Sequence, residues 1–275
     1  MKVMLRQTGV ALIQVLLITG LILLLVIQIS KDARHQVTTA QLWQDRVKAE
    51  LALNNAQERL LFGLLTQERL QTTDTELTRL WNFHGAPFEP LSADNAKLQV
   101  TVQDMAGLAS LTYSTDLVSK LMLAEGYSLS EAQEAIDLLE DWQGLQAKRN
   151  SRGPIQFRQE LDFIKAGLSD VLSEELTTYH PVSYFNPGTA PNPLLALMLT
   201  DDSLDSVLER RQKGTITARE LMVNLTPSID DEVSDYPSEM LRLTLSSQVG
   251  ETQLERSFMV RLQPEKSDPI IFLSE

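Results

Sequence analysis

The hydrophobic pattern divides the chain into an uncharged N-terminal segment, a long amphipathic stretch and a mixed C-terminal region. From Val10 to Ser30 no residue carries a charge, and Leu, Ile and Val dominate. At about 1.5 Å per residue, a helix of this length crosses a hydrocarbon core of about 30 Å. The pattern therefore predicts one transmembrane helix over residues 10–30.

The same helix is expected to continue beyond the membrane over residues 31–85. No proline precedes Pro87, and Gly20 and Gly63 are the only glycines between residues 10 and 66. The apolar positions recur at helical spacing, at Trp43, Val47, Leu51, Leu53, Ala56, Leu60 and Leu64. This stripe is expected to pack on a globular head. We place Trp43 and Phe62 in the helix–head contact and Trp81 and Phe83 at the exit of the helix, before Gly85-Ala86-Pro87 ends it.

Three segments alternate polar and apolar residues and are predicted to be strands, namely 97–102, 240–245 and 258–262. More than a hundred residues separate the first strand from the other two. The intervening chain is mostly helical in pattern, with predicted helices at 115–125, 130–142, 159–165, 173–178, 193–199 and 204–212. Ser130 and Ser203 are the predicted caps of two of them. The prediction is an α+β head, assigned to residues 97–112 and 220–275, with a helical domain inserted at 113–219.

Composition excludes several classes of function. The 275 residues include 43% hydrophobic positions, enough to bury a core, and carry a net charge of −13. So acidic a chain repels polyanions, and nucleic acid is not an expected partner. No cysteine is present, which excludes disulfides, zinc–thiolate sites, iron–sulfur clusters and cysteine nucleophiles.

No pattern in the sequence is typical of an enzyme. The chain has three histidines, His35, His84 and His180, and none belongs to a recognisable hydrolase or zinc-protease motif. We therefore expect no catalytic residues. His180, beside Pro181, is expected to be a surface or packing residue.

Two acidic clusters raise the question of calcium, namely 201–205 and 230–232 with Asp235. Neither has the glycine and terminal glutamate of an EF-hand loop, and helix capping accounts for Asp201 and Asp202. No metal site and no cofactor are predicted, although calcium remains a lesser alternative. Residues 161–168 have the pattern of a helix–hairpin–helix, but acidic residues surround it. We therefore interpret it as a structural or protein-binding hairpin.

The residues that flank the apolar segment indicate whether it is a secretory signal peptide or a membrane anchor. Lys2 and Arg6 precede it without an intervening acid, so the N-terminus is expected to stay in the cytoplasm and the bulk of the chain in the periplasm. A secretory signal peptide would end in small residues, whereas this segment runs into Lys31-Asp32-Ala33-Arg34. On the other side of the segment, Arg6-Gln7-Thr8-Gly9 followed by Val10-Ala11-Leu12 resembles the prepilin leader of type IV pilins and pseudopilins.

That resemblance implies cleavage between Gly9 and Val10 by a membrane aspartyl peptidase, which methylates the new N-terminus. Residues 1–9 would then be the leader. Glycine leaves an extended backbone unobstructed in a protease cleft. Most pilin-like proteins have Glu at the fifth mature position, whereas this chain has Gln14 there. Within the family, the K-class minor pseudopilins of type II secretion systems lack this Glu. Gln14 is therefore either a feature of a tip subunit or simply a tolerated polar residue.

Further landmarks are similar to those of the K class, in the same order. Asp104-Met105-Ala106-Gly107 occupies the place of an Asp-x-x-Gly sequence that leads into the helical insertion, although Ala109 and Ser110 depart from the usual residues that follow. The other landmarks are Leu138–Gln143, Pro154–Leu161, Phe185–Pro191 and Tyr236–Leu243, with Gly144 standing where an Asp is common. The resemblance implies a pilin-like long helix on a small antiparallel sheet, with an insertion built from two repeats similar to the sterile-alpha-motif (SAM) fold.

The function implied is that of a non-enzymatic minor pseudopilin at the tip of the pseudopilus, assisting the export of folded proteins across the outer membrane. Expected partners are the minor pseudopilins of the I and J classes, the pseudopilus, the prepilin peptidase and the inner membrane, which the chain would span once. Two alternatives stay open. One is a minor pilin of a type IV pilus, and the other is a single-span periplasmic enzyme or sensor with an accidental leader.

Overall fold

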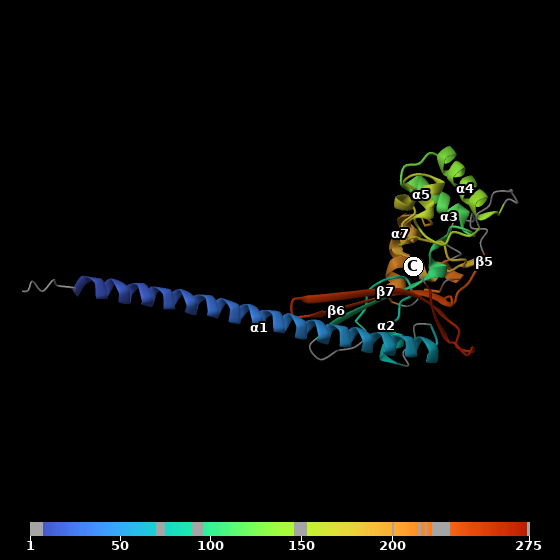
Figure 1. The fold of residues 1–275 in the computed structure, drawn as a ribbon. Helices are drawn as coiled ribbons and strands as arrows, with labels where there is room; N and C mark the ends of the chain where they lie inside the picture. The colour runs from blue at the N-terminus through green and yellow to red at the C-terminus, as the bar shows by residue number, and fades with distance from the viewer. Residues whose placement is uncertain are drawn as a thin grey trace, which may run out of the picture.

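The computed structural model describes residues 8–69, 75–89, 96–145, 153–199, 201–213, 216–217, 219–221 and 232–273, and the side chains of all these except 8–11, 201, 202, 232 and 233. One long helix, α1 (Thr8–Thr66), projects from a head that contains a four-stranded antiparallel sheet. Figure 1 shows this sheet between α1 on one side and a group of short helices on the other. The predicted α+β architecture is confirmed.

The sheet has the strand order β1-β6-β7-β8, built from β1 (Lys97–Asp104), β6 (Met240–Val249), β7 (Thr252–Leu262) and β8 (Ile270–Leu273). The three predicted strands are therefore present. The hairpin of β6 and β7 is longer than predicted, because strand pairing continues through the mostly polar residues 246–257, which show no alternation, to a tight turn at Gly250, where φ is +58°. β8 was not predicted, since four successive apolar residues have no alternation.

The outer half of α1 packs on the sheet through small and aliphatic side chains. The buried side chains on this helix are Ala49, Ala52, Leu53, Ala56, Leu60, Leu61 and Leu64, and all of them except Ala49 share a core cluster with Val100, Leu243 and Val260. Arg256 on β7 adds a polar contact, because its Nη1 donates to Asn54 Oδ1 at 2.9 Å and to Gln57 Oε1 at 2.8 Å. The helix and the sheet therefore form one packed unit.

The exit from α1 differs from the prediction. The helix ends at Thr66 rather than near residue 85, and a second helix, α2 (Glu76–Leu80), is capped by Thr75. No proline or glycine ends α1. Instead, Arg69 leaves the helix axis to donate from its backbone N to Tyr236 Oη at 3.2 Å and from Nη1 to Ser238 O at 2.6 Å. These partners are about 170 residues away in the chain, so local sequence could not indicate them.

Trp81 and Phe83 pack where they were predicted, but Trp43 and Phe62 do not. The rings of Trp81 and Phe83 are buried and meet edge to face, with centroids 5.5 Å apart. Trp43 is 62% exposed and lines a shallow hollow with Thr252 of β7, and Phe62 is 68% exposed, so neither side chain is buried in the helix–head contact. The stripe predicted as one face is in fact divided, because Trp43, Val47 and Leu51 stay exposed while the later positions are buried. Periodicity alone does not say which side of a helix meets the sheet.

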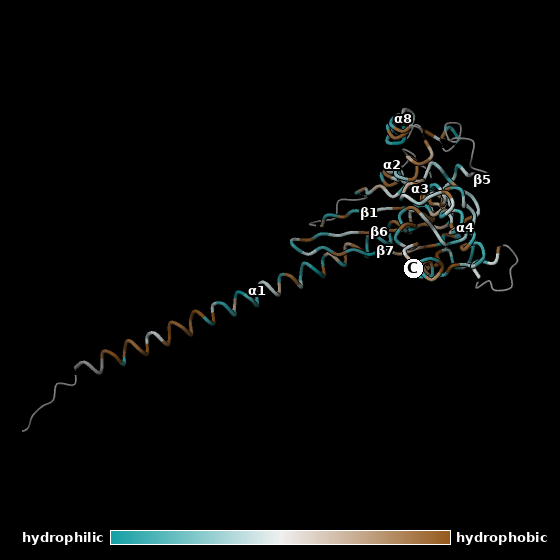
Figure 2. Tube along the Cα trace, turned by 90° about the horizontal axis from the view of Figure 1, so that it is seen from above, coloured by the Kyte–Doolittle hydropathy of each residue, from teal (hydrophilic) through white to brown (hydrophobic). Residues whose placement is uncertain are grey.

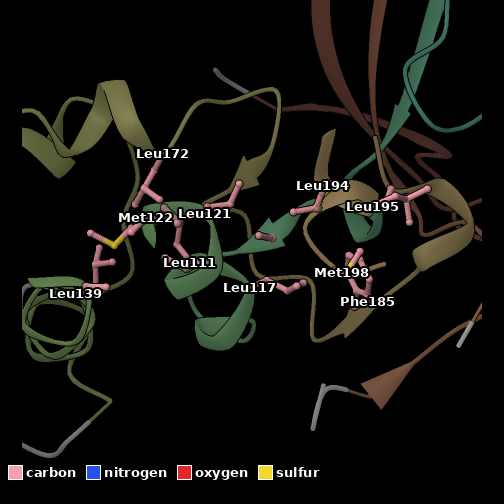
Figure 3. Packing of buried hydrophobic residues seen from close by; sticks show 14 of the residues in the cluster. Leu111, Leu117, Leu121, Met122, Leu139, Leu172, Phe185, Leu194, Leu195 and Met198 are labelled. Atoms are coloured by element: carbon pink, nitrogen blue, oxygen red, sulfur yellow. The ribbon is translucent and has the colours of Figure 1, made fainter. Parts of the chain in front are cut away.

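Between β1 and β6 lie the short helices η1 (Met105–Gly107), α3 (Thr115–Ala124), α4 (Leu129–Gln143), α5 (Glu160–Ile164), α6 (Leu168–Val171), η2 (Pro187–Thr189), α7 (Asn192–Ala196) and α8 (Asp201–Gln212). Most of them surround a hydrophobic cluster separate from the one beneath α1. Figure 3 shows its side chains, among them Leu117, Leu139 and Leu194. The cluster also takes in Ala109, Leu111 and Leu221, which lie outside the predicted insertion at 113–219. The two SAM-like repeats stay a prediction.

Three local predictions in this region are wrong. α4 is capped by Ser128, whose hydroxyl forms a capping box with Glu131, and not by Ser130. α8 begins at Asp201, before the predicted cap Ser203. Instead of a helix at 173–178, Thr177 and Thr178 form β3, which pairs in parallel with β2 (Ala109–Ser110). The β-branched threonines favour a strand once such a partner is present. A similar parallel pair joins β4 (Tyr184–Phe185) to β5 (Glu232–Val233).

Candidate functional site

The apolar half of α1 is the first candidate functional element. Its large apolar side chains from Leu12 to Ile29 are all more than half exposed, and by length and composition this helix can cross a membrane. Figure 2 shows the same segment as a run of apolar turns that extends away from the head. Because no break separates Leu12 from Leu64, the apolar segment and the segment that packs on the head belong to one helix.

The predicted processing residues lie at the start of this helix. Gly9 and Val10 fall within the first turn of α1, and residues 1–7 of the predicted leader lie outside the described residues. Gln14 lies one turn further along, exposed on α1 within the apolar segment. Cleavage after Gly9 and a role for Gln14 at a filament tip stay predictions.

The second candidate is an exposed apolar stripe on the part of α1 that packs on the head. Trp43, Val47 and Leu51 follow one another at four-residue steps and are between 52% and 62% exposed. Successive steps of four residues place side chains along one face of a helix. Phe62 extends this face toward the end of α1, while the opposite face is buried on the sheet. A second helix laid along α1 would meet this stripe.

The buried carboxylate of Asp104, at the end of β1, accepts hydrogen bonds from three separate segments of the head. Asp104 Oδ1 accepts hydrogen bonds from Ala106 N at 3.0 Å, from Ser238 N at 3.1 Å and from Ser238 Oγ at 2.5 Å. Asp104 Oδ2 accepts from Thr189 Oγ1 at 2.8 Å. Burial raises the pKa of this carboxyl above its usual range, and the hydrogen bonds from Ser238, Ala106 and Thr189 oppose the shift.

The neighbours of Asp104 pack too closely to admit another side chain. A Cβ placed on Gly107 would lie 2.2 Å from Thr189 O. Asn186 N donates to Ala106 O at 2.8 Å, and Gln103 Nε2 donates to Thr189 O at 3.1 Å. Three of the sequence landmarks thus meet at one point: Asp104-x-x-Gly107, the 185–191 segment and the 236–243 segment. Their shared role is to hold the helical region against the sheet.

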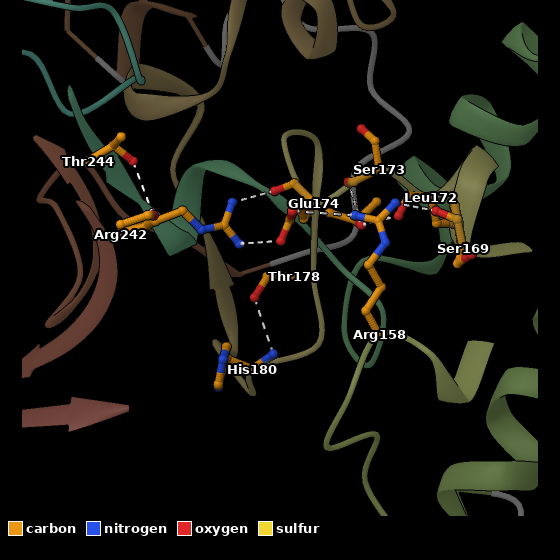
Figure 4. Close-up of polar contacts among 11 residues, drawn as sticks. Arg158, Ser169, Leu172, Ser173, Glu174, Thr178, His180, Arg242 and Thr244 are labelled. Atoms are coloured by element: carbon orange, nitrogen blue, oxygen red, sulfur yellow. Dashed lines mark hydrogen bonds and ion pairs between the residues drawn. The ribbon is translucent and has the colours of Figure 1, made fainter. Parts of the chain in front are cut away.

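A second junction consists of charged side chains (Figure 4). Glu174 lies between two arginines, with its Oε2 at 3.9 Å from Arg242 Nη2 and its Oε1 at 4.0 Å from Arg158 Nη1. Arg242 Nη1 also donates to the backbone O of Glu174 at 2.6 Å, and Arg158 donates to Ser169 O. Because Arg242 belongs to β6, this junction attaches the sheet to the loop that precedes β3.

The histidines lie on separate elements. His35 is exposed on α1, His84 lies beside the outer edge of β1, and His180 follows β3. Burial, together with the positive charge of Arg211, lowers the pKa of His84 to about 3, so its imidazole is neutral. Burial lowers the pKa of His180 as well, with Arg242 and Arg261 adding to the shift.

Arg211 is a half-buried cation held by oxygen acceptors. Its Nη2 donates to Gly188 O at 2.9 Å and to Ala190 O at 2.5 Å, and burial lowers its pKa to about 9. These contacts attach α8 to the loop that also supplies Thr189 to Asp104. Arg211 could not be singled out from the sequence, because two of its partners are backbone carbonyls that leave no sequence pattern and the third, Asn192 Oδ1 at 3.2 Å, lies 19 residues away.

Both acidic clusters lie partly outside the described residues, namely the side chains of 201, 202 and 232 and the whole of 230–231. Among the residues whose side chains are described, no three His, Asp or Glu residues are grouped so as to hold a metal ion. The hairpin predicted at 161–168 is formed by α5 and α6.

Comparison with protein-family models gives no match, and comparison with curated proteins gives none either. Among solved structures, the chain is similar to one described as the crystal structure of the GspK-GspI-GspJ complex from the type 2 secretion system of enterotoxigenic Escherichia coli. The two share 15% sequence identity with a TM-score of 0.48. The similarity covers 88% of this chain and 97% of that chain.

Proposed function

We propose that this chain is a membrane-anchored minor pseudopilin of the K class, located at the tip of a type II secretion pseudopilus. One observation carries the proposal. A single uninterrupted helix joins an exposed apolar segment to the core of the head, and the same helix keeps an apolar stripe exposed along its outer half. Such a helix is both an anchor and a surface along which the helices of other subunits pack.

The leader sequence adds to this support. A cleavage after Gly9 would free an N-terminus at Val10, at the start of the apolar segment. The helical region, the predicted SAM-like insertion, lies across the sheet from α1 and would form a bulky crown (Figure 1). A subunit with this bulky helical region hinders the addition of another subunit above it. Its lower face stays free for filament growth. The filament then helps to push folded proteins through the outer membrane.

The test of processing is the N-terminus of the mature protein. The full chain is extracted from membranes of strains with and without the prepilin peptidase, and its intact mass and N-terminal peptide are measured. A methylated chain beginning at Val10, seen only with the peptidase, is the expected result. Retention of residues 1–9 in both strains would overturn the proposal.

Deletion of the gene separates secretion from the pilus alternative. Loss of export of folded periplasmic enzymes, with twitching motility intact, is expected for a secretion subunit. Loss of twitching with intact export would instead assign the chain to a type IV pilus.

The packing of other subunits on α1 can be mapped with cysteines, because the natural chain has none. Val47→Cys, on the exposed stripe, is expected to cross-link to cysteines on the helices of the expected I- and J-class partners. Lys48→Cys is the matched control, since Lys48 is also exposed but points about 100° further around the helix. Equal cross-linking at both positions would show that the stripe has no special role.

A further inference from the structure

The two edges of the sheet differ. At the β1 edge, the chain covers itself with residues 83–88. Gly85 N donates to Val102 O, Phe88 N donates to Val100 O, and Val100 N donates back to Phe88 O, over 2.8–3.0 Å. Phe83 and Phe88 bury their rings in the core beneath α1. This edge is closed by an extended segment that carries aromatic side chains.

The β8 edge is open among the residues that the structure describes. β8 pairs with β7 only, in the register Met259↔Leu273 to Leu262↔Ile270, and Gln263 N donates to Pro269 O at 2.8 Å. Antiparallel ladders alternate, so 269, 271 and 273 bond toward β7 while Ile270 and Phe272 direct their N–H and C=O groups outward. No described residue pairs with those outward groups.

The side chains of β8 do not protect this edge. Exposed strand edges usually carry charges, prolines or bulges that prevent pairing with another chain. The part of β7 that does not pair with β8, residues 252–258, carries the charged residues Glu255 and Arg256. In contrast, Ile270-Ile271-Phe272-Leu273 has no charge. Phe272 is 57% exposed and packs at a tilt against Phe258, with ring centroids 5.7 Å apart, and Ile271 is 38% exposed on the opposite face. An added strand would therefore find apolar contacts on both faces.

We infer that β8 accepts an extended segment of a different protein, which adds a fifth strand to the sheet. The open backbone groups of Ile270 and Phe272 select a segment in strand conformation, as residues 83–88 show at the other edge. The net charge of the chain indicates which protein supplies this segment. Two copies of this chain would each carry −13 and repel one another, so the occupant is an uncharged or basic segment with apolar residues at alternate positions. The inference does not depend on the proposed membrane anchor or secretion role.

The test uses the full chain in detergent micelles and a synthetic peptide as the probe. The peptide alternates Val and Thr over seven residues with a lysine at each end, and it carries a fluorescent dye for anisotropy measurements. Its control has the same side chains but is N-methylated at every backbone amide of the seven residues, which removes the hydrogen-bond donors on both edges. Binding of the first peptide and not of the second is expected. Equal binding of both, or binding of neither, would overturn the inference.

A pair of protein variants locates the site. Ile270→Pro removes the outward N–H without removing a bond to β7, and Ile270→Ala removes the same side chain while keeping that N–H. The proline variant should bind the peptide roughly 3- to 10-fold more weakly than the alanine variant, the effect of one hydrogen bond. Thermal unfolding of both variants verifies that they are folded. Equal affinities would show that the peptide binds elsewhere.

Two further measurements distinguish the other possible occupants of this edge. Hydrogen exchange detects another segment of the same chain, and sedimentation detects a second copy. The amides of 270 and 272 should exchange fast in the free protein and slow down when the peptide is added. Slow exchange before the peptide is added would mean that another segment of this same chain covers the edge. A dimer of the natural chain that Ile270→Pro abolishes would mean that a second copy does so. Either result overturns the assignment to a different protein.

Discussion

Ser238 donates its hydroxyl hydrogen to Asp104 Oδ1 across 2.5 Å, although 134 positions separate the two residues in the chain. Asp104 ends β1, and Ser238 lies just before β6, the strand that pairs with β1 in the sheet. The hydrogen bond therefore joins the two points at which the chain leaves the sheet and returns to it.

Replacement of Asp104 by Asn should change how stability depends on pH. Burial raises the folded-state pKa of Asp104 above its unfolded value of 3.8, so its contribution to stability is fully present below that pH and is lost as pH rises through the folded pKa. Asn does not titrate there. Unfolding free energies measured by urea denaturation over a series of pH values should fall with rising pH more in the natural chain than in Asp104→Asn. If the unfolding free energies of the two proteins depended on pH in the same way, this would contradict a raised pKa for Asp104.

Gly107→Ala should destabilise the head by about 1–3 kcal/mol, the usual cost of overpacking. Its Cβ would meet the backbone of Thr189, which cannot move without breaking the contacts around Asp104. Gly63→Ala is the matched control, because the nearest atom there is the flexible end of Leu77, at 2.6 Å, and alanine favours the helix. Urea denaturation should show a clearly larger loss for Gly107→Ala.

Two leucines on α1 should respond differently to truncation. Leu60 is buried on the sheet, and Leu60→Ala should cost about 2–5 kcal/mol of unfolding free energy. Leu51 is 57% exposed on the opposite stripe, and Leu51→Ala should change stability by no more than about 0.5 kcal/mol. Thermal unfolding of the isolated protein measures both. A large loss for Leu51→Ala would mean that the stripe is part of the core.

His84 should make the protein less stable in acid. Its folded pKa of about 3 lies below the unfolded value of 6.5, so the unfolded chain binds a proton more readily between these values. Stability is therefore lost as pH falls from about 6.5 toward 3, and His84→Asn should lose less over this range. The ring protons of His84, followed by NMR, should show a neutral imidazole at pH values where an exposed histidine is charged.

The sequence by itself determined the elements whose signals are local. A run of uncharged residues from Val10 to Ser30 specifies an apolar helix, and alternation at 97–102, 240–245 and 258–262 specifies strands, because these periods follow from backbone geometry. The same reasoning located most of the helices between the strands. It also placed Asp104, Gly107 and Ser238 within landmarks, without showing that they touch.

Tertiary structure decided which surfaces meet. It buried Leu60 and left Trp43 exposed on one helix, ended α1 at Thr66 through the contacts of Arg69, and turned Thr177 and Thr178 into a strand by supplying a partner. It also closed one sheet edge with residues 83–88 and left the other without a described partner. These outcomes depend on groups far apart in sequence, and the free energy of burying them exists only once the chain has brought them together.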